Sequence, residues 1–188
     1  MAVGEQDITF LFKILVLGSE EGISASWKAL EPESMPNAAD ILQGVRFGAK
    51  TYLIPTNKID IGVKVFFCSF NPTTVFPLIR KAYLRGANGI LFSIHSVETL
   101  NNYGDILFDL LETNKDSLPV INVIFDGDPV NHKPIQNMFR RQIVTTAQKL
   151  QISDIENQTS LQFFKLEAAE TYVEATLKQL KIMINRVD

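Results

Sequence analysis

Small residues that follow an apolar run near the start of the chain have the general layout of a phosphate-binding loop. The run at residues 10–17 ends at Gly18, and Gly22 and Ser24 follow it before a predicted short helix. A loop of this kind binds phosphate through backbone N–H groups, a lysine and a Mg²⁺-binding hydroxyl, in the order G-x-x-x-x-G-K-[ST]. Gly22 and Ser24 fit that order only with a one-residue deletion, and Ile23 then takes the place of the lysine. By itself the stretch is therefore a poor match to a phosphate-binding loop, and it lacks the lysine.

Glu20 and Glu21 add negative charge at the same position. Carboxylates repel a triphosphate, by about 1 kcal/mol per pair of unit charges roughly 4 Å apart in water. They also complement the positive end of the helix that follows. We therefore expect a helix start that is neutralised by its own side chains and is not open to an anion.

The composition limits the other classes of function. A chain of 188 residues suits one domain over residues 1–188, with a sizeable core. The net charge of -3 gives no reason to expect a nucleic-acid partner. The single cysteine, Cys68, excludes an internal disulfide, and together with only two histidines it argues against a structural zinc site. The cysteine content fits a reducing compartment, and we expect a cytoplasmic protein.

Features that attach a protein to a membrane are missing from the sequence. No apolar run reaches the roughly 18 residues of a membrane span. The ends of the chain as given carry no signal-peptide layout and no cysteine or glycine placed for lipid attachment. These features predict no stable membrane anchor in this chain.

Apolar runs alternate with helical patterns along most of the chain. Two strand-like runs, residues 46–54 and 59–68, are separated only by a short turn and predict an antiparallel hairpin. The alternation elsewhere predicts parallel strands joined by helices, so the expected fold class is α/β with a mostly parallel sheet. The other predicted strands are residues 10–17, 89–94, 118–125 and 161–166, the predicted helices are 24–30, 76–84, 96–114, 134–150 and 170–185, and residues 31–40 are predicted as a loop.

Several segments resemble the Ras superfamily of small GTPases, most of all its Rab-like members. GVRFGAK at residues 44–50, followed by VKVFFC, resembles the second and third strands of that family. AYLRGANGILFSIHSVETLNN at residues 82–102 resembles its YYRGADG segment and the strand and ESL motif that follow. LPVINVIFDGD and FFKLEAAE stand where the family has LPVILVGNKxD and FFETSAK. The resemblance covers nearly the whole chain. It implies a six-stranded Ras-like P-loop fold, with helices on both faces and a guanine nucleotide among the loops at one edge.

Positions that contact the phosphates in that family carry different residues here. By the resemblance, Ser69 replaces the aspartate that holds Mg²⁺ through water, and Thr73 replaces the water-positioning glutamine. Pro72 replaces a glycine whose N–H contacts the terminal phosphate, and proline has no N–H to donate. Leu42 stands where the first switch has a threonine. The resemblance therefore implies that no catalytic residue remains.

The part of the family's site that binds the base is partly retained. By the resemblance, Asp128 matches the aspartate that reads guanine, and Ala168 matches an alanine whose N–H faces the guanine oxygen. Phe125 and Asp126 replace the family's asparagine and lysine. The motif DGDP also fits an acidic turn after a strand. A cation site at Asp126 and Asp128 would offer fewer oxygen ligands than a hard cation usually takes.

Two functions follow from the resemblance and its losses. The first is a pseudo-GTPase, which keeps the Ras-like fold, needs no cofactor and acts as an interaction or scaffold module for protein partners. The alternative is a divergent GTP- or GDP-binding switch with Mg²⁺ and slow hydrolysis, in signalling or trafficking. An unrelated α/β enzyme is a third hypothesis, for which the sequence offers no nucleophile, base or metal cluster. In the alternative, the nucleotide-binding residues are Gly18, Gly22, Ser24, Asp128 and Ala168.

Apolar side chains are the candidates for a partner surface. Phe70, Val75 and Phe76 fall in the region that serves as a switch and effector surface in the family. Trp27, on the short first helix, is interpreted as either a core residue or an exposed anchor for a partner. His95, at the end of a predicted strand, is interpreted as a loop or capping residue.

Overall fold

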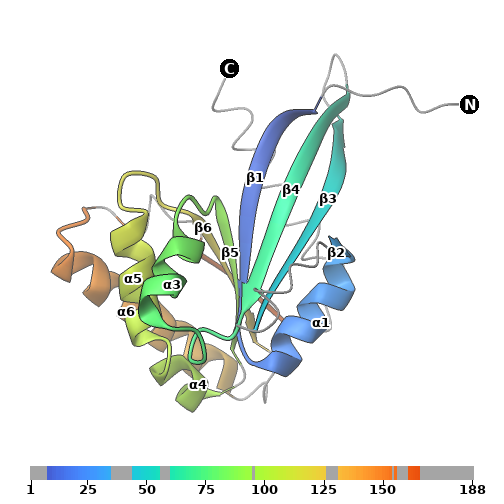
Figure 1. Ribbon diagram of the computed structural model, residues 1–188. Coiled ribbons are helices and arrows are strands. Elements are labelled where there is room, and N and C mark those ends of the chain that lie inside the picture. The colour runs from blue at the N-terminus through green and yellow to red at the C-terminus, as the bar shows by residue number, and fades with distance from the viewer. Residues whose placement is uncertain are drawn as a thin grey trace, which may run out of the picture.

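A single mixed β-sheet organises the chain (Figure 1). The computed structural model of the protein describes residues 8–34, 44–55, 60–94, 96–125, 131–153, 155 and 161–165. The strands are β1 (Ile8–Leu17), β2 (Glu33–Ser34), β3 (Val45–Pro55), β4 (Asp60–Phe70), β5 (Gly89–Ile94), β6 (Val120–Phe125) and β7 (Leu161–Lys165). Their order in the sheet is β2-β3-β4-β1-β5-β6-β7, so β1 lies at the centre, between β4 and β5.

Most neighbouring strands are parallel. β1 pairs in parallel with β4 and β5, and β6 pairs in parallel with β5 and β7. β3 and β4 form an antiparallel hairpin, whose register runs from Val45 opposite Phe70 to Pro55 opposite Asp60. The prediction of a mostly parallel sheet with one hairpin is therefore confirmed for the six longer strands. The two-residue β2 is a correction, because it lies in the predicted loop and adds a seventh strand, antiparallel to β3.

Helices cover both faces of the sheet, as predicted. The helices are α1 (Glu20–Leu30), α3 (Pro77–Leu84), α4 (Val97–Asn101), α5 (Gly104–Thr113) and α6 (His132–Lys149). Figure 1 shows α1 on one face and the other helices on the opposite face. Successive strand residues point to opposite faces, so Val16 packs with Leu30 of α1, whereas Leu17 packs with the α3–α6 layer. Each such fully buried side chain stabilises the fold by about 1.5–3 kcal/mol.

The helix predicted over residues 96–114 is two helices. Ser96 caps α4, and its Oγ accepts a hydrogen bond from the Thr99 N–H at 3.2 Å. The helix is interrupted at Tyr103. The ring of Tyr103 is buried, and its centroid lies 5.9 Å from the centroid of the Phe92 ring. Apolar residues keep their helical spacing on both sides of this break, so the sequence pattern did not reveal it. The predicted helix over residues 170–185 lies outside the described residues.

β1, β3 and β4 extend beyond the helices at one end of the sheet (Figure 1). Leu11 and Leu53 lie on these extensions and are 65% and 57% exposed. The carboxyl ends of β1, β4 and β5 meet at the other end of the sheet. In a parallel α/β sheet, that is the end at which ligands bind.

Candidate functional site

A two-residue connection, Gly18 and Ser19, joins β1 to α1. Ser19 is the N-cap, and its Oγ accepts a hydrogen bond from the Gly22 N–H at 3.2 Å. The cap engages an N–H group that would otherwise be available to an anion. α1 begins at Glu20, earlier than predicted, so Gly22 lies inside the first turn of the helix and not at the end of a loop.

Ser93 of β5 packs directly on this connection. An added Cβ atom at Gly18 would lie 2.7 Å from the Ser93 Cβ, and one at Gly22 would lie 2.0 Å from the Ser93 Oγ. Both separations are shorter than van der Waals contact, so only glycine fits at these positions. Ser93 itself is buried. The two glycines that the motif assigned to phosphate binding therefore allow the start of α1 to approach β5.

Arg46 of β3 reaches the first turn of α1. Its guanidinium forms an ion pair with Glu20, and its Nη1 donates to the Ser24 Oγ at 3.3 Å. The side chains of Arg46 and Glu20 are 41% and 61% exposed, so water screens the pair and it contributes less than about 1 kcal/mol. The hydroxyl that the phosphate-loop pattern assigns to Mg²⁺ is thus bonded to a cation of the chain itself.

The residues that follow β4 form hydrogen bonds with nearby residues of the chain, unlike the side chain of Ser69 near its end. Ser69 is fully buried, and its Oγ has no hydrogen-bond partner among the described residues. The Asn71 Oδ1 accepts hydrogen bonds from the Thr73 N–H at 3.0 Å and from the Thr73 Oγ1 at 2.8 Å. The Pro72 carbonyl oxygen accepts one from the Arg80 Nη1 at 3.3 Å. Thr73 and the Pro72 carbonyl are therefore engaged in local structure, whereas in the described part of the chain the buried Ser69 hydroxyl is not.

A buried ion pair that the sequence analysis missed joins α3 to α5. The Arg80 Nε donates to the Asp109 Oδ2 at 3.0 Å, and its Nη2 contacts the same oxygen. The Lys81 Nζ lies 2.7 Å from the Glu112 Oε2 and 3.3 Å from the Asp109 Oδ1, and these two carboxylates raise the pKa of Lys81. One signal was present: Arg80 stands four residues before the buried Leu84, and an arginine on a buried helix face requires an acidic partner.

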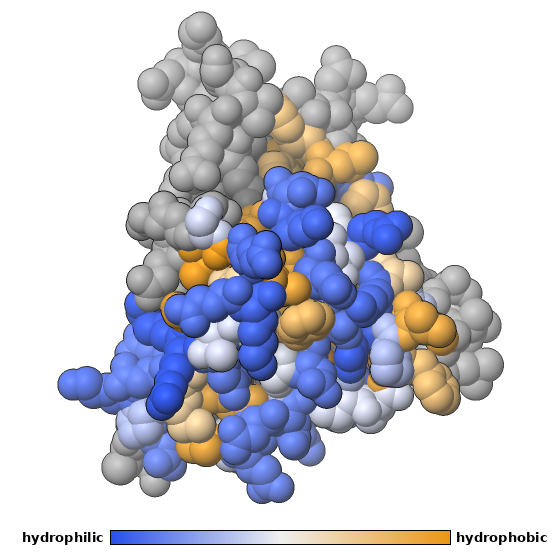
Figure 2. All heavy atoms as spheres, turned by 90° about the vertical axis from the view of Figure 1, so that its left-hand side faces the viewer, coloured by the Kyte–Doolittle hydropathy of each residue, from blue (hydrophilic) through white to orange (hydrophobic). Residues whose placement is uncertain are grey.

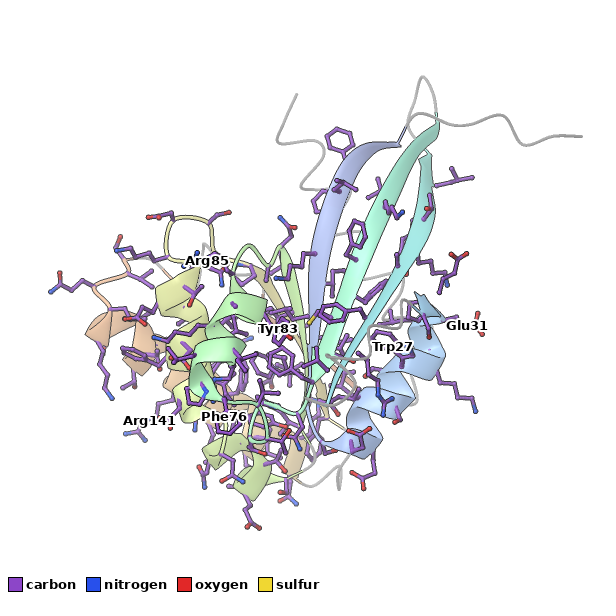
Figure 3. All side chains as sticks on the ribbon, in the orientation of Figure 1. Trp27, Glu31, Phe76, Tyr83, Arg85 and Arg141 are labelled. Carbon is purple, nitrogen blue, oxygen red and sulfur yellow. The ribbon has the colours of Figure 1, made fainter. Side chains whose placement is uncertain are left out.

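The partner-surface candidates divide between core and surface. Phe70 and Val75 are 0% and 6% exposed, so the structure corrects their assignment to a surface. The Phe70 ring packs against the Tyr83 ring, and the two ring centroids lie 5.9 Å apart. Phe76 is 77% exposed at the start of α3 (Figure 3), and Leu78, which the sequence analysis missed, is 87% exposed. Leu78 stands two residues from Arg80, which places it on the opposite side of the helix.

Trp27 is half-buried between α1 and the strands (Figure 3). Its ring meets the Phe67 ring edge to face, with the centroids 6.4 Å apart. It also covers Gly48, where an added Cβ atom would lie 3.0 Å from the Trp27 ring. The contacts support its interpretation as a core residue.

Several predicted site residues lie outside the described residues. Leu42, His95, Asp126, Asp128 and Ala168 belong to this set. Within the described ranges, no group of three or more His, Cys, Asp or Glu side chains could hold a metal ion. Among the helices in those same ranges, none has the length and apolar character needed to cross a bilayer.

The fold and the site define an α/β protein with a mixed sheet, in which the carboxyl end of the central strand is packed with the protein's own side chains. A comparison with protein-family models finds no match to the chain. A comparison with curated proteins also finds no match. Any assignment finer than the α/β class therefore depends on the residues and the geometry given above.

Proposed function

We propose that this chain is a pseudo-GTPase, a Ras-like fold that binds no nucleotide tightly and acts as a protein-interaction module. The observation that carries the proposal is the short connection between β1 and α1, with Ser93 packed against Gly18 and Gly22. A phosphate group needs open space in front of the backbone N–H groups at such a helix start. Here Ser19 caps the helix and Ser93 lies against it.

The arrangement of the sheet supports the Ras-like part of the proposal. The resemblance implies six strands, mostly parallel, with one hairpin after the first helix, and the six longer strands have this arrangement. Ligands of such sheets bind at the carboxyl end, where neighbouring strands lead to opposite sides. β1 lies at this position, so its end at Gly18 is where a nucleotide phosphate would have to bind.

The surface of α3 supports the interaction role. Phe76 and Leu78 are both more than three-quarters exposed, although each is large and apolar. Arg80 and Asp109 fix the same helix on α5 from its buried side. A rigid helix with exposed apolar side chains is suited to bind a protein partner.

Nucleotide content tests the proposal directly. The purified protein is denatured, its supernatant is chromatographed for nucleotides, and native protein is titrated with a fluorescent GTP analogue in Mg²⁺. We expect no stoichiometric nucleotide and no saturable binding in the low-micromolar range. Stoichiometric GDP, or tight binding that depends on Mg²⁺, would establish the divergent GTP-binding switch instead.

The interaction role is tested with a matched pair of surface variants. Phe76→Ser/Leu78→Ser removes the two exposed apolar side chains at the start of α3, and Leu11→Ser/Leu53→Ser removes two exposed ones from the strand extensions. Crosslinking in cell extract, followed by identification of the captured proteins, compares both with the wild type. We expect a partner of the wild type to be lost only with the α3 variant. Equal capture by both variants would exclude this surface.

A further inference from the structure

α6 carries concentrated positive charge. The helix contains four cationic side chains, and it has no acidic residue. The whole chain has a net charge of -3, so the rest of the protein is correspondingly acidic. Such an asymmetry favours an anionic partner on this side of the molecule. The four cations are Lys133, Arg140, Arg141 and Lys149.

A groove of about 440 Å³ lies between α5 and α6, and two of these four cationic side chains line it. Figure 2 faces this side of the molecule, where hydrophilic side chains surround smaller hydrophobic areas. Phe108 and Met138 contribute apolar surface to the groove, and Asp105 is the one acidic side chain among the described residues that line it. Its two cations are Arg141, labelled in Figure 3, and Lys149.

Polar groups of this groove are left without partners in the described part of the chain. The Gln142 side chain lines the groove, and its buried Oε1 accepts no hydrogen bond within the described ranges. Arg141 and Lys149 form no ion pair with a described residue. A buried acceptor without a donor is unfavourable, so a ligand that supplies a donor and negative charge complements the groove.

We propose that this groove binds an acidic peptide segment of a partner protein. Arg141 and Lys149 are separated by eight residues, which corresponds to about 12 Å along the helix axis. Acidic side chains at positions i and i+4 of an extended segment are separated by about 13 Å, which matches this spacing. A peptide N–H group can donate to the Gln142 Oε1, and an apolar side chain of the same segment can contact Phe108 and Met138.

An anionic membrane surface fits the groove less well. The apolar side chains of α6, including Ile135, Phe139 and Ile143, are buried in the core. The helix therefore has no free apolar face to insert between lipids.

Fluorescence anisotropy tests this groove with a fluorescein-labelled peptide that carries one leucine and two glutamates four positions apart in a serine–glycine background. We expect the wild type to bind it and to bind the version with glutamines in place of the glutamates much more weakly. Arg141→Ala/Lys149→Ala is expected to weaken binding about fivefold, because two charge pairs are lost. The control Lys28→Ala/Lys133→Ala removes the same charge outside the groove, and it should change the affinity less than about twofold.

A variant that should strengthen peptide binding distinguishes a change in groove charge from a loss of fold, because unfolding can only weaken binding. Asp105→Asn removes a negative charge from the groove and is expected to strengthen peptide binding about twofold. Gln142→Leu is expected to weaken binding without changing its dependence on salt concentration. Circular dichroism verifies that each variant is folded.

Three results would overturn the proposal: no peptide binding at millimolar concentration, equal weakening by the groove variant and its control, or cosedimentation with phosphatidylserine vesicles in place of peptide binding. The groove is separate from the start of α1. These results therefore leave the proposed pseudo-GTPase function untouched.

Discussion

At the scale of single residues, Ser93 packs against the two glycines at the start of α1. A glycine in a strand-to-helix connection permits close approach, either of a phosphate or of neighbouring protein atoms. Gly18 and Gly22 both face Ser93, so in this protein the close approach is between α1 and β5. The same residue type thus has a packing role where the motif predicted a binding role.

Gly22→Ala should lower the free energy of unfolding by about 1–3 kcal/mol, because the added methyl group overlaps Ser93. Adding Ser93→Gly to this variant should recover most of the loss, since it removes the atoms that clash. Urea unfolding measures both effects. Gly104→Ala is the control, because no atom lies within 4 Å of its added Cβ. Equal losses at the two glycines would contradict the packing role of Gly22.

Tyr52 should make the protein less stable at high pH. Burial raises the pKa of Tyr52 to about 12, whereas tyrosine in the unfolded chain ionises near pH 10. Between these values the folded state binds more protons than the unfolded state, so stability falls as the pH rises. Tyr52→Phe should reduce this fall. Urea unfolding at pH values near 7 and 10.5 compares it with the wild type.

The same substitution also has an expected effect at neutral pH. The Tyr52 hydroxyl is buried without a hydrogen-bond partner among the described residues, so its removal should leave stability unchanged or raise it by about 1 kcal/mol. Identical pH dependence in the two proteins would show that Tyr52 does not ionise in this way.

At the scale of elements, α3 combines a fixed buried side with an exposed apolar side. Arg80 bonds both to Asp109 on α5 and to the Pro72 carbonyl oxygen before the helix. It therefore holds the start of α3 in place, while Phe76 and Leu78 remain exposed. A helix fixed in this way loses little conformational entropy when it binds a partner.

Asp109→Ala should lower the free energy of unfolding by about 3–5 kcal/mol, because it leaves the buried guanidinium of Arg80 without its counter-charge. Glu112→Ala removes the exposed partner of Lys81 and should cost less than about 1 kcal/mol. Thermal and urea unfolding of both variants give the comparison. A cost for Asp109→Ala as small as that for Glu112→Ala would mean that the buried pair does not hold α3.

At the scale of the whole molecule, side chains from three neighbouring elements contact the start of α1 at the end of the central strand. Ser93 comes from β5, Arg46 from β3 and Ser19 from the β1–α1 connection. A nucleotide normally stabilises the fold that binds it by mass action. Under the proposed function, the protein's own contacts take the place of that stabilisation.

GDP with Mg²⁺ should therefore leave the thermal unfolding midpoint unchanged within about 1 °C at roughly millimolar nucleotide. A ligand present at a hundred times its dissociation constant adds about 2.7 kcal/mol, which would shift a domain of this size by roughly 5–10 °C. Differential scanning fluorimetry with and without nucleotide makes the measurement. A shift of several degrees that requires Mg²⁺ would contradict the proposed function.

The order of strands and helices could be predicted from the sequence alone. Apolar residues repeat at the periods of strands and helices, and the short turn before β4 leaves room only for a hairpin. These signals are local, so they predicted the six longer strands, four of the five described helices and the parallel character of the sheet. They did not predict the break at Tyr103, because apolar residues keep their helical spacing on both sides of it.

The tertiary structure decided what the local patterns left open. Phe70 and Phe76 are the same residue type six positions apart, yet one is in the core and the other is exposed. Ser93 lies against Gly22, and Arg80 pairs with Asp109, across long separations in the chain. Such contacts have no period and no spacing that a sequence can show. They exist only once the sheet places these elements side by side, and the Ser93 contact packs the start of α1 against β5 at the position where the motif predicted phosphate binding.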